Sequence, residues 1–212
     1  MQPVADKAHN PALVRLIALL AYPALIAVAL WLDQPEWRAL GLPLLALAAV
    51  GPWPAHWGGR LVLLFSLPLA AVVIISPALA LWPPGLICLA TAAWFGQSLL
   101  PGRQPLIRQF ASIVQAHQGG ELPPDSDTWL RGWTVVWAGL LLLLGGIALA
   151  LAATEQASLW LLWVSIAIPG LVLLTLISEY LLRRWHFPTH EHPSLVRFLM
   201  LLAHVRPGEL AR

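Results

Sequence analysis

Charged residues and cysteines are scarce in this chain of 212 residues. Only 10% of its residues are charged, whereas about a quarter are charged in a typical soluble domain. So few charged side chains cannot cover a globule of this size with polar surface, which excludes an ordinary soluble domain. Cys88 is the only cysteine, which excludes a disulfide scaffold, and a hydrophobic content of 59% excludes a disordered chain. We therefore expect most of the exterior to contact lipid.

Signatures of common cofactors and of nucleic-acid binding are also missing. The sequence contains no G-x-x-x-x-G-K, G-x-G-x-x-G, H-E-x-x-H or C-x-x-C motif. The net charge is only +2, and the tryptophans lie beside apolar runs instead of among clustered Lys and Arg. We predict no cofactor and no nucleic-acid partner.

Long apolar runs make up most of the sequence. A helix needs about 20 predominantly apolar residues to cross the hydrocarbon core of a bilayer. About six runs, bounded by charges, Pro, Gly or Trp, are predicted to be transmembrane helices: 11–32, 39–54, 61–81, 84–100, 133–153 and 159–182. The third and fourth are joined at Trp82-Pro83-Pro84. The predicted fold class is an all-α membrane protein in which residues 1–212 form a single polytopic domain.

The basic residues are unevenly distributed between the two sides of these six spans. With both termini on one side, Arg38 is the only basic residue on the other. Cytoplasmic loops collect Lys and Arg, so both termini, the loop 101–132 and the tail 183–212 are predicted to be cytoplasmic. If the short second and fourth runs did not span, four spans would remain. In the six-span arrangement, the side of the termini carries all the other basic residues: Lys7, Arg15, Arg60, Arg103, Arg108, Arg131, Arg183, Arg184, Arg197, Arg206 and Arg212.

Polar groups are rare within the predicted spans. The middles of the spans contain no charged residue and no histidine, which argues against an ion or proton pathway. Gln97 and Ser98 form the most polar pair, for which a helix–helix hydrogen bond is the simplest interpretation. Gly146, Ala150 and Thr154 recur every four residues and predict a close helix contact.

Two cytoplasmic segments have the apolar stripe of an amphipathic, interfacial helix. One follows Pro193, with a stripe from Leu195 to Val205. The other starts at Pro105, and its stripe comprises Leu106, Ile107, Phe110, Ile113 and Val114. The helix that starts at Pro105 either lies on the anionic inner leaflet, where basic residues attract lipid, or packs against the protein's own spans. The helix after Pro193 is predicted to lie on the membrane surface.

Arginines near these segments are candidate ligands for lipid head groups or phosphate. They are Arg103, Arg108, Arg183 and Arg184. Glu179 and Arg183, four residues apart, are predicted to form a simple ion pair on a helix surface.

The tail contains the densest group of residues with catalytic or metal-binding side chains: His186, His190, Glu191 and His192. Their imidazole and carboxylate groups are suited to general acid–base catalysis, and the three histidines are possible zinc ligands. Prolines 188 and 193 interrupt the segment, so the side chains need not converge. We favour a solvated turn at the membrane interface and predict no metal.

Several short motifs resemble a family of small bacterial inner-membrane proteins. The motifs are PLIRQFA at 105–111, LPP at 122–124, WLRGWTV at 129–135, EYLLRR at 179–184 and HPSL at 192–195. Members of that family are encoded beside acyl carrier protein, adenylating ligase, ketosynthase and acyltransferase genes. These gene clusters make pigment lipids of the aryl polyene or xanthomonadin type.

The resemblance implies an accessory or scaffold for acyl-chain lipid biosynthesis that docks soluble acyl-carrier enzymes at the cytoplasmic face. The implied partners are membrane lipids, an acyl carrier protein and other pathway enzymes. The resemblance supplies no catalytic residue. Two alternatives stay open: a membrane-bound acyl- or lipid-transfer enzyme that uses the cytoplasmic His and Arg cluster, and a component of a lipid exporter.

Overall fold

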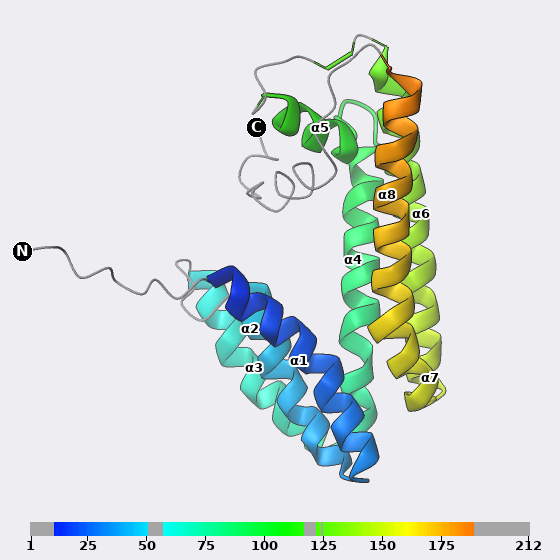
Figure 1. Cartoon of the computed structure of the whole chain (residues 1–212). Coiled ribbons are helices and arrows are strands. Elements are labelled where there is room, and N and C mark those ends of the chain that lie inside the picture. The colour runs from blue at the N-terminus through cyan, green and yellow to red at the C-terminus, as the bar shows by residue number, and fades with distance from the viewer. Residues whose placement is uncertain (1–10, 51–56, 117–121, 124, 189–212) are drawn as a thin grey trace, which may run out of the picture. The chain divides into compact units, whose positions relative to one another are not determined.

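The computed structural model describes residues 11–50, 57–116, 122–123 and 125–188, and this part of the chain is helical without strands (Figure 1). Contacts within the chain divide it into two compact units. The first comprises Met1–Pro83 and Ala148–Ser165, and the second comprises Pro84–Ile147 and Ile166–Arg212. Each unit has its own buried core.

Three helices in the described residues are long and apolar enough to cross a membrane. They cover Pro77–Ser98, Ser126–Ala153 and Ala157–His186. These helices coincide with the predicted fourth, fifth and sixth spans, each extended at one or both ends. The first three predicted runs fall on shorter apolar helices. An all-α fold with three membrane-length helices is therefore confirmed.

The first unit is built from several complete helices and from the C-terminal end of one longer helix. α1 contains Pro23 and α3 contains Pro68, yet both continue through these residues. The elements are α1 (Pro11–Trp31), η1 (Pro35–Leu40), α2 (Gly41–Val50), α3 (Trp57–Ile75), η2 (Pro77–Leu81) and α7 (Ala157–Leu162), with the end of α6 (Ser126–Ala153).

Two helix ends in this unit close in the same way. Asp33 after α1 and Glu155 after α6 both have a φ of 53°. The following N–H groups, of Gln34 and Gln156, each donate to a carbonyl five residues earlier at 3.0 Å. This is the Schellman pattern, in which a residue of positive φ lets the chain turn back on the last helical carbonyls. The ends of both helices thus receive backbone hydrogen bonds from their own turns.

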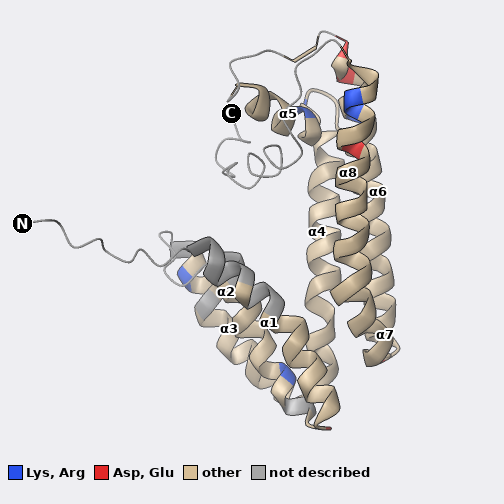
Figure 2. Cartoon of the chain, viewed as in Figure 1, with Lys and Arg blue, Asp and Glu red and all other residues tan. Residues whose placement is uncertain are grey.

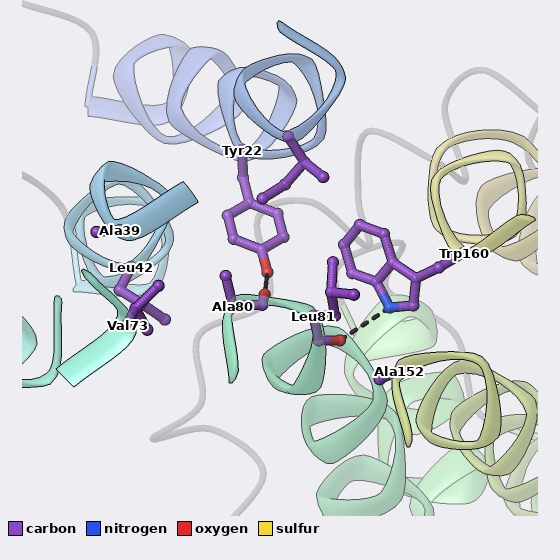
Figure 3. Packing of buried hydrophobic residues seen from close by; sticks show 9 residues of the cluster. Tyr22, Ala39, Leu42, Val73, Ala80, Leu81, Ala152 and Trp160 are labelled. Atoms are coloured by element: carbon purple, nitrogen blue, oxygen red, sulfur yellow. Dashed lines mark hydrogen bonds between the residues drawn. The ribbon is translucent and has the colours of Figure 1, made fainter. Parts of the chain in front are cut away.

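The core of the first unit contains two long-range hydrogen bonds to η2 (Figure 3). The Tyr22 hydroxyl donates to the carbonyl of Ala80, and Trp160 Nε1 donates to the carbonyl of Leu81 at 2.8 Å. Pro84 has no N–H to donate to Ala80, four residues before it, so Tyr22 satisfies this carbonyl instead. The two aromatic rings pack edge to face with centroids 6.3 Å apart.

The predicted boundary between the third and fourth spans is wrong. The helix breaks at Ser76, and η2 leads directly into α4 (Trp82–Ser98). Pro83 and Pro84 therefore lie in the first turn of α4 instead of in a loop. Proline is tolerated there because its ring already has a helical φ and the first N–H groups of a helix need no intrahelical acceptor.

The second unit consists of α4, α5 (Leu106–Ala116), most of α6 and α8 (Ile168–His186). In Figure 1, α4, α6 and α8 run along one another, and α5 lies across one end of them. A π turn at Trp163–Ala167 directly precedes α8. Pro169 explains this turn, because it cannot donate to the carbonyl of Ser165 and the wider turn relieves the clash.

Gly145 brings α6 close to α4. A Cβ atom on Gly145 would lie 2.9 Å from both the Gly85 carbonyl oxygen and Cys88 Cβ. The contact predicted at Gly146, Ala150 and Thr154 is wrong, because these three residues are exposed. Thr154 bonds to the Ala150 carbonyl of its own helix. The face that α6 buries instead carries Trp137, Leu141, Leu144, Ala148 and Ala152.

We expect Gly145→Ala to destabilise the protein by about 1–3 kcal/mol, because the added methyl group meets backbone that cannot move aside. Gly146→Ala is the matched control: nothing lies within 4 Å of its Cβ position, and helix propensity favours alanine by about 1 kcal/mol. Thermal unfolding of both variants in the same detergent measures the difference. Equal melting temperatures would contradict the close approach at Gly145.

Candidate functional site

α5 is held in place by hydroxyl groups from two other helices. The N–H of Leu106 donates to Ser98 Oγ at 2.9 Å, and the N–H of Ile107 donates to Thr134 Oγ1 at 3.3 Å. These are the first two N–H groups of α5, which have no acceptor within their own helix. The hydrogen bond expected near Gln97 and Ser98 is therefore found at Ser98, where it caps α5.

The apolar face of α5 packs against the protein itself. Leu106, Ile107, Ala111 and Val114 are buried, and the first three join residues of α4 and α6 in one core. Of the two interpretations for this amphipathic segment, packing against the protein's own helices is the one found. Arg108, on the other side of α5, pairs with an Asp127 carboxylate oxygen at 2.7 Å.

The charged groups of the second unit gather at its α5 end (Figure 2). In the described part of this unit, α4 carries no charged residue, and neither do the stretches 132–147 of α6 and 168–178 of α8. The described residues of the α5 end include five arginines and three carboxylates: Arg103, Arg108, Arg131, Arg183 and Arg184, with Asp125, Asp127 and Glu179. This end is therefore basic, and the rest of the unit is apolar.

A partly open cavity of about 250 Å³ lies between α4, α5, α6 and α8. Its walls are mainly apolar: α5 contributes Ile107, Phe110, Ala111 and Val114. Phe95, Trp137 and Leu176 come from the other three helices. Among the described residues, the charged ones that line it are Glu179 and Arg183, both from α8. The cavity thus combines an apolar interior with one ion pair.

Glu179 is buried within this arrangement, with only 3% of its surface exposed. Its Oε2 accepts a hydrogen bond from Trp137 Nε1 at 2.9 Å, and its Oε1 pairs with the Arg183 guanidinium. The predicted i, i+4 ion pair is therefore confirmed, but its location on the helix surface is wrong. The carboxylate faces the core, and α6 supplies a hydrogen bond that a surface pair would lack.

One aromatic ring lies against the Arg183 side of this pair, and a second ring stacks on the first. The guanidinium carbon lies 5.5 Å from the ring centroid of Trp129, within the range of a cation–π interaction. His186 stacks on the same indole, with centroids 6.3 Å apart and planes inclined by 14°. His186 is exposed and lies at the end of α8, outside the set of residues that line the cavity.

The other candidate residues have different environments. Arg103 and Arg184 are exposed, whereas Arg108 and Arg183 are partly buried in the ion pairs described above. In the described ranges no group of three or more His, Cys, Asp or Glu side chains converges as for a metal. His190, Glu191 and His192, with the predicted helix after Pro193, lie outside the described residues, so their role stays a prediction.

Sequence reasoning missed Trp137 and the cavity. A signal for this site was present: a carboxylate within a predicted span, as Glu179 is, is costly to bury and normally has a partner. The sequence pattern predicted only the i, i+4 pair with Arg183, the nearest charged residue. Trp137 lies 42 residues away, and only the packing of α6 against α8 joins the two.

We expect Glu179→Ala to destabilise the protein by about 3–5 kcal/mol, because it removes the carboxylate that compensates Arg183. Glu179→Gln should cost less, since its amide oxygen still accepts from Trp137. The control is Asp125→Ala, which removes an exposed carboxylate of the same unit and should change stability by less than about 0.5 kcal/mol. Apparent melting temperatures in detergent measure all three. Equal values for Glu179→Ala and Asp125→Ala would contradict a structural role for Glu179.

Known proteins give no further indication of what this site does. Comparison of the chain with protein-family models, curated proteins and solved structures finds no match. The resemblance to membrane proteins of acyl-lipid gene clusters therefore rests on short sequence motifs, and its functional implication stays a prediction. What the site can do has to be inferred from its own residues.

Proposed function

We propose that this protein is a multi-pass protein of a bacterial inner membrane that serves as an accessory in acyl-chain lipid biosynthesis. Its α5 end lies at the cytoplasmic face and docks soluble enzymes that carry acyl groups on an acyl carrier protein. The accessory holds the growing or finished chain at the membrane surface while soluble partners act on it.

The observation that carries this proposal is the combination found at the α5 end. A short amphipathic helix, an apolar cavity and most charges of the second unit occur together there. The apolar cavity is suited to a hydrocarbon chain, and the excess of arginine is suited to an anionic lipid surface or an anionic partner. No charge lies in the middle of the three membrane-length helices, which favours an accessory over an ion-coupled transporter.

The proposed topology has six spans, with the N and C termini cytoplasmic. The three membrane-length helices supply spans four to six. α1 has 21 residues and α3 has 19, so either could cross a hydrocarbon core of about 30 Å at 1.5 Å per residue. α2 has only 10 residues, and η1 precedes it directly. Without α2 five crossings would remain, so termini on the same side require either that α2 spans or that a second segment also does not cross, which leaves four spans.

Cysteine labelling tests this topology, since Cys88 is the only native cysteine and Cys88→Ala keeps the Cβ atom that contacts Gly145. In that background, Glu155→Cys should react with a membrane-impermeant maleimide in cells with a permeabilised outer membrane. Arg103→Cys and Arg60→Cys should react only after lysis. Before lysis, labelling of Arg60→Cys but not of Arg103→Cys would replace six spans by four. Labelling of Arg103→Cys but not of Glu155→Cys would reverse the proposed orientation.

Docking is tested with the purified protein in nanodiscs and the acyl carrier protein of the same bacterium, loaded with an acyl chain. We expect binding that weakens with salt, and a roughly tenfold loss of affinity in the double variant Arg103→Glu, Arg184→Glu, because both arginines are exposed at this end. The matched control carries lysine at both positions and should bind nearly as the unmodified protein does. Absence of binding at low salt, or equal affinity in both variants, would refute docking through these arginines.

A further inference from the structure

We infer that the cavity between α4, α5, α6 and α8 is a binding site for the hydrocarbon part of an acyl group, whose carbonyl or carboxylate oxygen accepts a hydrogen bond from Arg183. This deepens the proposed function, on which it rests for the physiological source of the chain. The site itself is argued from the cavity wall, the cavity volume and the single ion pair.

The wall of the cavity excludes water as the preferred occupant. Seven of its nine lining residues are apolar, and the two charged ones lie on the same helix. A buried water needs two to four polar partners, and only the Glu179 and Arg183 end of the wall offers any. Hydrocarbon loses nothing by contact with Phe95, Ala111 and Leu176, so a chain is the occupant that this wall favours.

The volume of the cavity sets the size of the occupant. Apolar cavities of about 150 Å³ already bind small hydrocarbons such as benzene, and pockets for drug-sized ligands measure about 300–1,000 Å³. At about 250 Å³, this cavity lies between the two. It fits one end of an acyl chain, and not a whole phospholipid with two chains.

The ion pair orients the chain. The Arg183 side chain is 18% exposed and the Glu179 side chain is 4% exposed, so the guanidinium is the more accessible partner. A guanidinium carries five N–H donors in a planar fork, which allows it to hold a carboxylate and an acyl oxygen at once. The methyl end of the chain then lies between Phe95 and Leu176, and the oxygen-bearing end lies at Arg183 near the basic surface.

Photolabelling of the full-length protein tests this site directly. The probe is dodecanoic acid that carries a diazirine near its methyl end, added to the protein in nanodiscs in the absence of any acyl carrier protein. Peptide mapping should place the label on the cavity-facing parts of α4, α5 and α8. Label confined to lipid-exposed positions such as Leu142 and Leu143 of α6 would overturn the inference.

Variants that fill the cavity supply a second readout. Ala111→Leu, whose side chain enters the cavity, should reduce specific labelling at least fivefold. Ser112→Leu, on the next and exposed position of α5, should leave labelling unchanged. Leu176→Trp with the exposed control Leu173→Trp repeats the comparison from α8, in case Ala111→Leu does not fold. Equal labelling of a folded cavity variant and its control would overturn the inference.

Competition identifies the polar contact and the source of the chain. Unlabelled dodecanoate should compete at least tenfold better than dodecane, and this advantage should vanish in the double variant Glu179→Gln, Arg183→Gln, which still offers Trp137 an acceptor. Competition by dodecanoate but not by added phospholipid identifies a free or carrier-borne acyl chain, and the reverse identifies a membrane lipid. Equal competition by dodecane would refute the role of Arg183. Because no partner protein is present, loss of docking through Arg103 and Arg184 leaves this experiment unaffected.

Discussion

The hydrogen bonding of backbone groups where helices are interrupted is the constraint on which this structure depends. A protein core, like a membrane interior, offers no water to an unpaired N–H or carbonyl, so each buried interruption of a helix needs a partner from within the protein. Tyr22 and Trp160 donate to the carbonyls of η2, and Ser98 and Thr134 accept from the first N–H groups of α5. Few polar side chains are present, and these four are placed where the backbone requires them.

The same need for partners within the protein explains the contacts of the buried ion pair at the α5 end. Glu179 receives hydrogen bonds from two directions, and the guanidinium of Arg183 lies over an aromatic ring. A buried carboxylate that is paired and hydrogen-bonded in this way is tolerated in an apolar core, whereas a single unpaired charge is not. Because α5 crosses the helix ends at this point, the pair comes to line an apolar cavity. Structural satisfaction and the chemistry proposed for the cavity therefore depend on the same side chains.

Periodicity along the chain predicted α5 and its apolar stripe, because that information is local to eleven residues. The register of α6 could not be predicted in this way. Gly145 and Gly146 are adjacent glycines in an apolar run, and either could have faced a neighbouring helix. Only Gly145 meets the backbone of α4. The rotation of a nearly uniform apolar helix is set by the shape of its neighbours, which the hydropathy of the sequence does not encode.

The sequence by itself determined the helical fold class, the apolar runs of membrane-spanning length and the gathering of charge in a few segments. These features depend on composition and on local patterns along the chain. Only the tertiary structure decided which polar groups are buried and what they contact. Glu179 and Trp137 are 42 residues apart, and Leu81 and Trp160 are 79 apart. Such contacts arise when whole helices pack, so their partners follow from shape and distance in space. The cavity with its single ion pair belongs to this second class of features.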